Sequence, residues 1–390
     1  MSGATDMEVA VACGGTGGHL FPGLAVGREL RARGVGVTLL VSPKEVDREA
    51  VAGVTDLRVR VLPAVGLQGR NYLGFGWSVV RSMVAARRLF RERRPSVVLG
   101  MGGFTSVPPI LAGRWMGCRT ALHESNTVPG RANRWLGRRV DLAMVGFEEA
   151  SGRWGARSVE VTGTPVRECI RPLDATSCRV ELGLDPAKPV LTIMGGSQGA
   201  TGLNRAMAAA LPQIVARWPF LQCLHLCGHR DLEAMRRAHA EAGMRSVVEP
   251  FSSRMERVLG ATTVAVARSG ASTLAEFAAA GVPSVLVPFP ASVDDHQRFN
   301  ARAMEVAGAA RVMEQADMAP GRVVVALACF LDDEPARARC ARAALGLHRP
   351  DAARRMADRL VALARVRGTD RGGRDATVGR AVPGVTGVAP

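Results

Sequence analysis

A histidine, His19, directly follows a stretch with four glycines, Gly14, Gly15, Gly17 and Gly18. Glycine lets the backbone turn sharply and approach a ligand, and an imidazole can take a proton near neutral pH. The stretch has neither the GxGxxG spacing of a dinucleotide-binding loop nor the Gly-Lys-Ser/Thr of a P-loop. It therefore predicts a phosphate-sized nest with a candidate catalytic histidine at a helix entrance. The alternative is a structural histidine.

A second candidate is Glu276, the single carboxylate of a segment whose composition predicts a helix over Ala271–Ala280. Val264–Ala267 predicts the strand before it, and Ser269-Gly270 breaks the two apart. A carboxylate near the start of a ligand-binding helix can accept two hydroxyl donors, which suits the vicinal diol of a ribose. The alternative is a surface glutamate on an amphipathic helix.

A second glycine-rich turn begins with Gly195, Gly196 and Ser197, after a predicted strand over Val190–Met194 and before a helix from Leu203. Ser197 is predicted to cap that helix, where its hydroxyl, its amide and the helix dipole could take a phosphate. The distance between the two glycine-rich turns is what two successive domains of one type would give.

The elements that position these residues alternate between strands and helices. Apolar runs predict further strands over Met7–Ala12, Val35–Val41, Val97–Met101, Thr120–Leu122 and Val285–Val287, and Pro22–Leu30 predicts a helix. The polar loops GGFTS and HESN follow two of these strands. Because the carboxyl ends of parallel strands meet at one edge of a sheet, the loops are expected to converge there.

The composition bounds the class of protein. At 390 residues two domains are expected, and 47% hydrophobic with 22% charged residues is typical of a globular chain. The net charge of +16 comes almost wholly from arginine, since lysine occurs only at Lys44 and Lys188, and it favours anionic partners such as phosphates or a membrane face. With 4% aromatic residues and one tyrosine, platforms for stacking nucleic-acid bases are not expected.

The sequence predicts no signal peptide, because the short N-terminal stretch carries Asp6 and Glu8 and runs directly into a predicted strand. It predicts no membrane span either, because the longest uncharged runs contain proline and several glycines. Eight cysteines without a CxxC pair suit a reducing compartment. The group Cys223, His225, Cys227 and His229 has the residue types of a metal site. Its alternation is that of a strand, which separates the two cysteines by about 13 Å, so a structural role is predicted.

A basic stretch over residues 66–94 contains apolar and aromatic side chains, among them Leu73, Phe75 and Trp77. Such a mixture is typical of a membrane-surface patch. The alternative is that the apolar side chains belong to the core and the arginines form a solvated face.

Six motifs occur in order: GGTGGH, HESN, GTPVR, GGSQGA, RSGASTLAE and DDHQ. Together they resemble the MurG family, bacterial enzymes that transfer N-acetylglucosamine to undecaprenyl-pyrophosphoryl-muramoyl-pentapeptide in peptidoglycan synthesis. The resemblance covers roughly Met7–Leu363. It implies an α/β fold of the GT-B glycosyltransferase type, with two Rossmann-like domains facing a cleft.

The resemblance also implies a division of the chain. Residues 1–166 would bind the acceptor and dock on the membrane, and residues 167–350 would bind UDP-N-acetylglucosamine. A helix over 351–366 would cross back to the first domain. The tail over 367–390, rich in Gly, Pro and Arg, is predicted to be disordered.

Carried over to matching positions, the resemblance implies roles for individual residues. Arg167 and Ser197 would take the phosphate and uridine end, and Phe251 would meet the uracil through its backbone. The nucleotide would be lined by Ala271, Ser272, Thr273, Leu274, Ala275 and Glu276, with Glu276 on the ribose. Gln297 would contact the sugar, and the first domain would close on it with Thr16, Gly17, Gly18 and Asn126. The family usually has Gln where this chain has Ser125.

The implied reaction is an inverting single displacement in which His19 takes a proton from the muramoyl 4-hydroxyl while UDP departs. The helix after Ser197 would stabilise the diphosphate, and since the sequence has no Asp-x-Asp pair, neither a metal nor a cofactor is expected. The implied partners are UDP-N-acetylglucosamine, the lipid acceptor and the anionic cytoplasmic face of the cell membrane, where the protein would be peripheral; nucleic acid is not expected. Rival interpretations are a UDP-N-acetylglucosamine epimerase, a diacylglycerol galactosyltransferase and a non-catalytic module that binds anionic surfaces.

Overall fold

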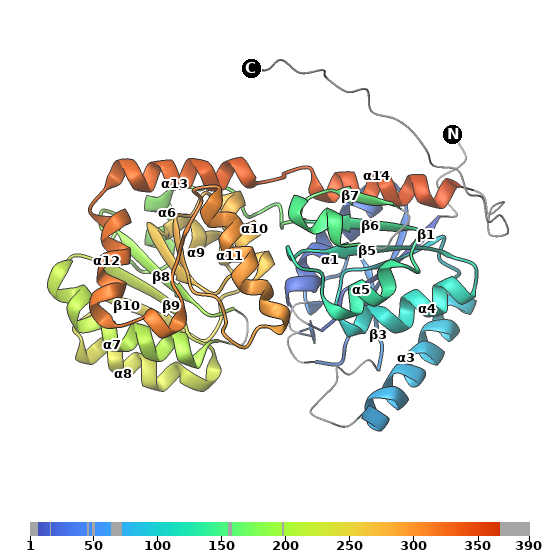
Figure 1. The fold of residues 1–390 in the computed structure, drawn as a ribbon, viewed down its shortest axis with the longest axis horizontal. Helices are drawn as coiled ribbons and strands as arrows, with labels where there is room; N and C mark the ends of the chain where they lie inside the picture. The colour runs from blue at the N-terminus through green and yellow to red at the C-terminus, as the bar shows by residue number, and fades with distance from the viewer. Residues whose placement is uncertain are drawn as a thin grey trace, which may run out of the picture.

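The computed structural model describes residues 7–15, 17–44, 47–48, 51–63, 72–154, 158–196 and 199–366. Thr16, Ser197 and the tail over 367–390 lie outside the described residues, as do the side chains of Leu73 and Phe75. The described chain forms two α/β domains that lie side by side along the long axis of the molecule (Figure 1).

The first domain is built on a seven-stranded parallel sheet in the order β3-β2-β1-β4-β5-β6-β7. Its strands are β1 (Glu8–Ala12), β2 (Gly36–Val41), β3 (Arg58–Val61), β4 (Val97–Gly100), β5 (Arg119–Glu124), β6 (Leu142–Val145) and β7 (Val159–Val161). Its helices are α1 (Gly17–Ala32), α3 (Tyr72–Glu92), α4 (Val107–Trp115) and α5 (Arg131–Gly137), with the 3₁₀ turns η1 (Phe104–Ser106) and η2 (Glu148–Arg153).

The second domain has a six-stranded parallel sheet in the order β10-β9-β8-β11-β12-β13. Its strands are β8 (Val190–Met194), β9 (Gln222–Leu226), β10 (Ser246–Glu249), β11 (Val264–Ala267), β12 (Ser284–Leu286) and β13 (Arg311–Val312). Its helices are α6 (Ala175–Glu181), α7 (Thr201–Arg217), α8 (Leu232–Glu241), α9 (Met255–Ala261), α10 (Ala271–Ala280), α11 (His296–Val306), α12 (Pro320–Leu331) and α13 (Glu334–Leu347), with the 3₁₀ turns η3 (His229–Asp231), η4 (Val293–Asp295) and η5 (Gln315–Asp317).

Both sheets reverse their strand order at the same place, between β1 and β4 in the first domain and between β8 and β11 in the second. Ligands of open parallel sheets bind at this switch point, outside the carboxyl ends of the strands. All the glycine-rich loops predicted from the sequence follow these four strands. The predicted class, two Rossmann-like α/β domains, is confirmed.

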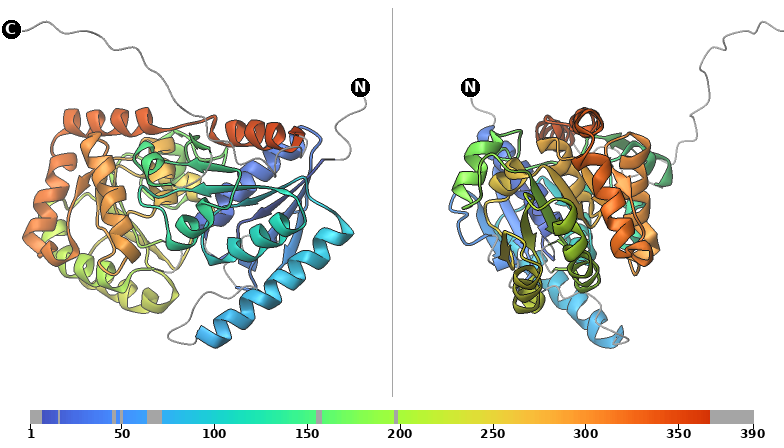
Figure 2. Two further views of the ribbon diagram at one scale, coloured as in Figure 1. Left: turned by 45° about the vertical axis from the view of Figure 1, so that its right-hand side comes forward. Right: turned by 90° about the vertical axis from the view of Figure 1, so that its left-hand side faces the viewer.

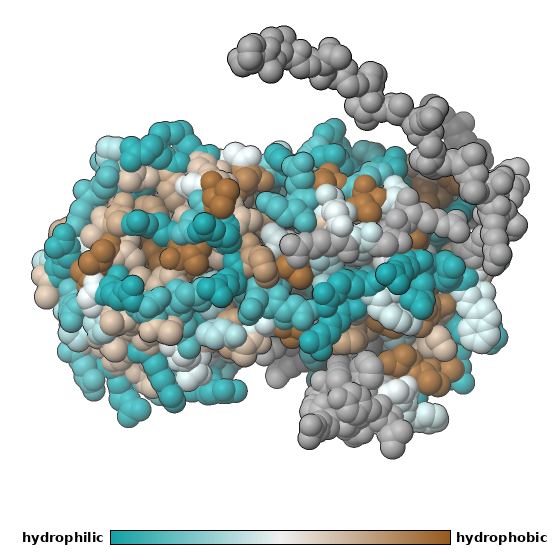
Figure 3. All heavy atoms as spheres, viewed as in Figure 1, coloured by the Kyte–Doolittle hydropathy of each residue, from teal (hydrophilic) through white to brown (hydrophobic). Residues whose placement is uncertain are grey.

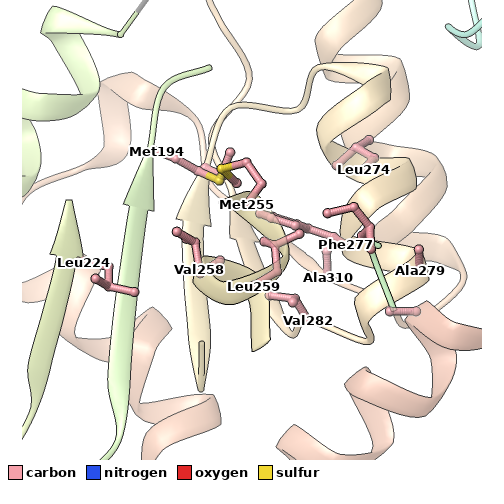
Figure 4. Packing of buried hydrophobic residues seen from close by; sticks show 14 of the residues in the cluster. Met194, Leu224, Met255, Val258, Leu259, Leu274, Phe277, Ala279, Val282 and Ala310 are labelled. Atoms are coloured by element: carbon pink, nitrogen blue, oxygen red, sulfur yellow. The ribbon is translucent and has the colours of Figure 1, made fainter. Parts of the chain in front are cut away.

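Apolar side chains cover both faces of each sheet. The central strands β1 and β8 are buried along their whole length, as expected for parallel strands between two layers of helices. In the second domain, Leu274 and Phe277 of α10 pack with Met255 and Leu259 of α9 in one buried cluster (Figure 4). This packing fixes α10, whose other side faces the first domain.

The last helix, α14 (Ala352–Arg365), returns to the first domain after α13 has covered the second (Figure 1). Its buried residues Met356, Ala357 and Leu360 belong to the core that contains β1, β2 and α1. Arg33 adds an ion pair to Asp358, with 2.7 Å between Nη1 and Oδ1. The chain therefore crosses between the domains twice, after β7 and after α13.

Two helix starts differ from the prediction. Helix α1 begins at Gly17 rather than at Pro22, so His19 lies in its first turn. Proline is favoured at a helix start, but here it sits one turn later, where its missing N–H removes only the bond to the carbonyl of Gly18. Helix α7 begins at Thr201 with Ala200 at its N-cap, so the prediction that Ser197 caps this helix is wrong.

Helix α3 projects from the body of the first domain (Figure 2). Trp77 on this helix is 66% exposed, so the alternative that it is a core residue is wrong. Apolar residues also gather at the surface where α3 and α4 lie (Figure 3). No helix within the described part of the chain is both long and apolar enough to span a bilayer.

Candidate active site

A cavity of about 840 Å³ lies between the two domains at the carboxyl ends of both sheets. Its first wall comes from the start of α1 and the loops after β4 and β5. Its second wall comes from the loops after β8 and β10 and from the starts of α10 and α11. The predicted site residues that line it are Gly17, Gly18, His19, Asn126, Arg167, Phe251, Ala271, Ser272, Thr273, Glu276 and Gln297.

Two predicted residues lie elsewhere. Leu274 is buried in the core, and with Ala275 it lines a separate cavity of about 260 Å³ behind α10. Neither residue lines the large cavity, although Thr273 and Glu276 on either side of them do. Successive residues of a helix point in different directions, so these two positions lie on another side of α10. Thr16 and Ser197 lie outside the described residues.

The glycine-rich loop after β1 is held by a buried carboxylate, Asp47. Gly15 N donates to Asp47 Oδ2 at 2.7 Å, and Ser42 N and Oγ donate to the same oxygen at 2.9 and 2.6 Å. Gly15 has a φ of +113°, and a Cβ at Gly14 would lie 2.3 Å from Ser42 N, so both positions require glycine. The sequence did not reveal Asp47, since nothing local connects it to this loop.

His19 is half-buried, with its ring against Gly102 and Gly103. A Cβ at Gly102 would lie 3.0 Å from His19 Nε2, so the loop after β4 leaves just enough room for the imidazole. Burial lowers the pKa of His19 below its usual 6.5, against an opposing effect of the carboxylates Glu124 and Asp47. The imidazole is therefore neutral at pH 7 and able to accept a proton.

The HESN loop has two titratable groups, Glu124 and His123, and both make hydrogen bonds within the first domain. Glu124 Oε1 accepts from Asn126 N and Nδ2 at 2.9 and 2.8 Å, and Oε2 accepts from Gly130 N and Asn133 Nδ2, both at 2.9 Å. His123 is fully buried, donates from Nε2 to Gly163 O at 3.0 Å, and has its pKa lowered to about 4 by burial. Glu124 thus shapes the loop, and His123 is held by the carbonyl of Gly163.

On the second wall, Glu276 forms an ion pair with Arg167. Glu276 Oε1 lies 2.7 Å from Arg167 Nη2, and less than a fifth of either side chain is exposed. Burial raises the pKa of Glu276, while Arg167 acts in the opposite direction. The Arg167 guanidinium lies 4.4 Å from the centre of the Phe21 ring, which fixes it in place. Within the described residues, Glu276 Oε2 accepts no hydrogen bond, so it is available to a ligand.

The start of α10 offers an anion site and touches the first domain. Gly270 is its N-cap and no described side chain caps it, so its first amides and the helix dipole face the cavity. Ser272 Oγ donates to Gly18 O at 2.9 Å. That carbonyl is the one that Pro22 leaves without its intrahelical donor, so a proline in α1 creates an acceptor for the opposite domain.

The start of α11 forms the remaining edge. Gln297 Oε1 accepts from Phe289 N at 3.0 Å, which orients the amide so that Nε2 is a donor with no partner in the described part of the chain. Asp294 makes ion pairs with Arg131 and Arg134 of α5 across the mouth of the cavity. It was not predicted, because the DDHQ motif shows nothing of a partner in the other domain.

Two left-handed aspartates precede α11. Asp294 and Asp295 have φ values of +53° and +51°, a conformation that costs most side chains free energy. A bend of this kind lets the chain turn sharply into α11 beside the cavity.

Of the cysteine and histidine group, Cys223 and His225 are buried on β9 and Cys227 is buried just after it, whereas His229 is exposed in η3. His225 Nδ1 lies 2.9 Å from His239 Nε2, and Asn204 Oδ1 lies 3.1 Å from His225 Nε2. In the described part of the chain, no group of three or more His, Cys, Asp or Glu could hold a metal ion.

The sequence matches two halves of a known enzyme family. Residues 9–145 match the N-terminal domain of glycosyltransferase family 28, and residues 190–356 match its C-terminal domain. The matched segments contain every residue that lines the cavity except Arg167, which lies between them.

Relatives with assigned functions cover nearly the whole chain. The UDP-N-acetylglucosamine–N-acetylmuramyl-(pentapeptide) pyrophosphoryl-undecaprenol N-acetylglucosamine transferase of Acidithiobacillus ferrooxidans is 41% identical over 355 residues, 89% of this chain and 95% of the relative. The enzyme of the same name from Xanthomonas euvesicatoria is 39% identical over 360 residues, 92% of this chain and 81% of the relative.

Solved structures agree with these relatives. The MurG crystal structure from Acinetobacter baumannii has a TM-score of 0.71 at 28% identity, covering 91% of this chain and 99% of its own. A putative UDP-N-acetylglucosamine 2-epimerase from Listeria monocytogenes has a TM-score of 0.69, covering 96% of this chain and 100% of its own. Its identity is only 16%, so it shares the fold alone.

Proposed function

The chain belongs to the family of UDP-N-acetylglucosamine–N-acetylmuramyl-(pentapeptide) pyrophosphoryl-undecaprenol N-acetylglucosamine transferases within glycosyltransferase family 28, and we propose that it catalyses this transfer. It moves N-acetylglucosamine from UDP-N-acetylglucosamine to the lipid-linked muramoyl pentapeptide of peptidoglycan synthesis. The observation that carries the proposal is 41% identity over 95% of the A. ferrooxidans transferase, a match that spans both cavity walls.

The donor is proposed to bind the second wall. Glu276 Oε2 accepts from the ribose hydroxyls, the backbone at Phe251 meets the uracil, and the Nε2 of Gln297 donates to the sugar. The diphosphate lies at the start of α10, near Gly195, Gly196 and Arg167, so its charge is balanced by a helix dipole and a guanidinium. The feature that supports the arrangement is Glu276 Oε2, a carboxylate oxygen beside this anion site that has no hydrogen-bond donor among the described residues.

The reaction proposed is a single displacement with inversion. The muramoyl 4-hydroxyl oxygen attacks the anomeric carbon, the bond from that carbon to the β-phosphate oxygen breaks, and its electron pair leaves with UDP. His19 takes the hydroxyl proton, which its lowered pKa permits because the imidazole is already neutral. The charge that develops on the leaving diphosphate is met by dipoles that are fixed before the reaction. That the chemistry needs neither metal nor cofactor stays a prediction.

The acceptor is a lipid, so the protein is proposed to act as a peripheral protein at the cytoplasmic face of the cell membrane. Support comes from the exposed side chains of Trp77 on α3 and Trp115 on α4, 66% and 64% exposed. Arg87 stacks on Trp115 with 3.8 Å from its guanidinium carbon to the ring centre, so cation and aromatic ring occur together. Such pairs suit an anionic lipid surface.

The test is transfer of labelled N-acetylglucosamine to lipid. The purified protein is incubated with labelled UDP-N-acetylglucosamine, with and without the lipid acceptor, and labelled lipid is expected only with acceptor. Release of the label as free sugar or as an epimerised nucleotide sugar, independent of acceptor, would support the rival epimerase interpretation instead.

His19 is tested in the same assay. His19→Ala is expected to lower kcat by about 10²–10⁴, the usual contribution of acid–base catalysis, with little change in UDP affinity. In the parent protein the acidic limb of the kcat profile should fall below pH 6.5, because burial lowers the pKa of His19, and it should vanish in the variant. A near-normal rate in His19→Asn, which keeps a side-chain donor, would refute the base assignment.

A further inference from the structure

Asn300 on α11 is a fully buried amide that bonds to both domains. Its Oδ1 accepts from Thr127 N and from Thr127 Oγ1, both at 3.0 Å. Its Nδ2 donates to Asn126 Oδ1 at 3.0 Å and to Ser269 O at 3.2 Å. The two donor and two acceptor capacities of the carboxamide are therefore all used, three of them across the domain boundary.

The orientation of this amide follows from its partners. The backbone N–H of Thr127 can only donate and the carbonyl of Ser269 can only accept, so Oδ1 and Nδ2 of Asn300 cannot be exchanged. The same reasoning fixes Asn126. Its Oδ1 must face Asn300, and its Nδ2 donates to Glu124 Oε1 at 2.8 Å. With partners counted among the described residues, Asn126 keeps one N–H and one lone pair for a ligand in the cavity that it lines.

The groups that Asn300 joins belong to the two halves of the site. Ser269 precedes Gly270, the N-cap of α10, and its Oγ donates to Gln297 O at 2.7 Å. This turn therefore links the start of α10 to the start of α11. Asn126 and Thr127 belong to the HESN loop, on the wall that holds His19.

We propose that Asn300 is a positioning residue that couples the donor-binding turn of the second domain to the HESN loop of the first. It acts through Asn126, whose amide it holds against the sugar position when the two domains are together. This inference rests on the proposed function, since the sugar position is that of the transferred N-acetylglucosamine. The uridine end is held by the second domain alone and does not depend on Asn300.

The test separates kcat from nucleotide affinity. Asn300→Ala and the isosteric Asn300→Asp, which loses both N–H donors, are assayed for transfer to the lipid acceptor and for UDP affinity by calorimetry. We expect kcat to fall by about 10–100-fold, as for a misplaced group near the reacting atoms, with UDP affinity changed by no more than about threefold.

The matched control is Gln222→Ala. Gln222 is likewise a buried amide of the second domain, bonded to Asp185 and Lys188, but it lies at the start of β9, at the opposite edge of the sheet from the cavity. It is expected to lower the unfolding temperature without changing kcat. If the Asn300 variants lose kcat only in proportion to stability and UDP affinity, the role is structural and the proposal is wrong.

A double-mutant cycle tests the route of the effect. Because Asn300 holds the amide of Asn126 and also bonds to Thr127, the loss of kcat in Asn126→Ala combined with Asn300→Ala should be smaller than the product of the two single losses. Multiplicative losses would overturn the proposal.

A second measurement does not use the reaction. Small-angle scattering should give a larger radius of gyration for Asn300→Ala than for the parent protein with UDP-N-acetylglucosamine, since three bonds across the boundary are lost. An unchanged radius would refute the coupling. A parent protein that fails to label the lipid would refute the proposed function instead, and the scattering result would still decide on Asn300.

Discussion

Replacing Glu276 by Gln changes one atom of the cavity wall and removes one charge. In the protein, Glu276 Oε1 accepts from Arg167 Nη2 at 2.7 Å, and Oε2 is the oxygen proposed to face the ribose. Gln offers one acceptor oxygen instead of two, so Arg167 and the ribose diol must compete for it. The change leaves the shape of the side chain and the packing of α10 intact.

The magnitude follows from the kind of bond that is lost. A hydrogen bond to a charged group contributes roughly 1.5–3 kcal/mol, and each 1.4 kcal/mol is a factor of ten in affinity. Glu276→Gln should therefore weaken UDP binding by about tenfold to 100-fold. Burial raises the pKa of Glu276, so the charge is costly in the empty protein, and its removal should lower stability much less than affinity.

Calorimetry with two ligands identifies the cause. The parent protein should bind 2′,3′-dideoxyuridine diphosphate more weakly than UDP, and Glu276→Gln should bind the two alike. Glu305→Gln is the matched control, because Glu305 lies on α11 and accepts from Val312 N at 3.0 Å but does not line the cavity. Equal UDP affinity in Glu276→Gln and the parent would refute the ribose assignment. An equal loss for both ligands would mean that Glu276 acts through Arg167.

Three further outcomes are expected. Replacing Trp77 and Trp115 with Ser should reduce sedimentation of the protein with anionic liposomes, since both rings are exposed, and should leave UDP affinity unchanged. Loss of the cooperative thermal transition in this variant would show that the two rings support the fold instead. Burial lowers the pKa of His225 to about 3 and of His239 to about 4, so below pH 6.5 the unfolded chain binds more protons than the folded protein. The stability that the two neutral histidines allow is therefore fully present above pH 6.5, and the free energy of unfolding should fall from there towards pH 4. Urea unfolding of His239→Gln should show a shallower loss over this range, and an unchanged slope would contradict the assignment. Gly281 has a φ of +68° at the end of α10, so Gly281→Ala should lower the free energy of unfolding by roughly 1–2 kcal/mol, and no loss would refute the strain argument.

Elements whose ends are marked by local signals were predictable from the sequence. The strand over Val264–Ala267 and the helix over Ala271–Ala280 have the predicted bounds, because Gly270 starts the helix and the left-handed Gly281 ends it. The start of α1 was not predictable in this way. Pro22 has the signature of a helix start, and only the glycines before it, which packing holds in place, allow the helix to begin earlier.

The residues that line the cavity were predictable to the extent that they follow strands. His19, Asn126 and Glu276 lie near the ends of β1, β5 and β11, and a parallel sheet brings such loops to one edge. What the sequence could not reveal are pairs between distant residues. Asp47 holds the first glycine-rich loop, and Asn300 bonds across 173 residues to Thr127. No periodicity or spacing encodes such pairs, because the first forms only when distant segments of one domain pack together and the second only when the two domains meet.

The contacts between the domains are concentrated where the donor is proposed to bind. Ser272 at the start of α10 donates to Gly18 O, the carbonyl that Pro22 leaves open, and Asn300 in the second turn of α11 bonds to the HESN loop. The starts of α10 and α11 thus both line the cavity and make hydrogen bonds to the first domain. A ligand that orders these helix starts also orders the groups that hold the first domain, so donor binding and domain approach must favour each other. His19 lies on the wall that approaches, and we therefore expect the base to reach its working position only once the donor is in place.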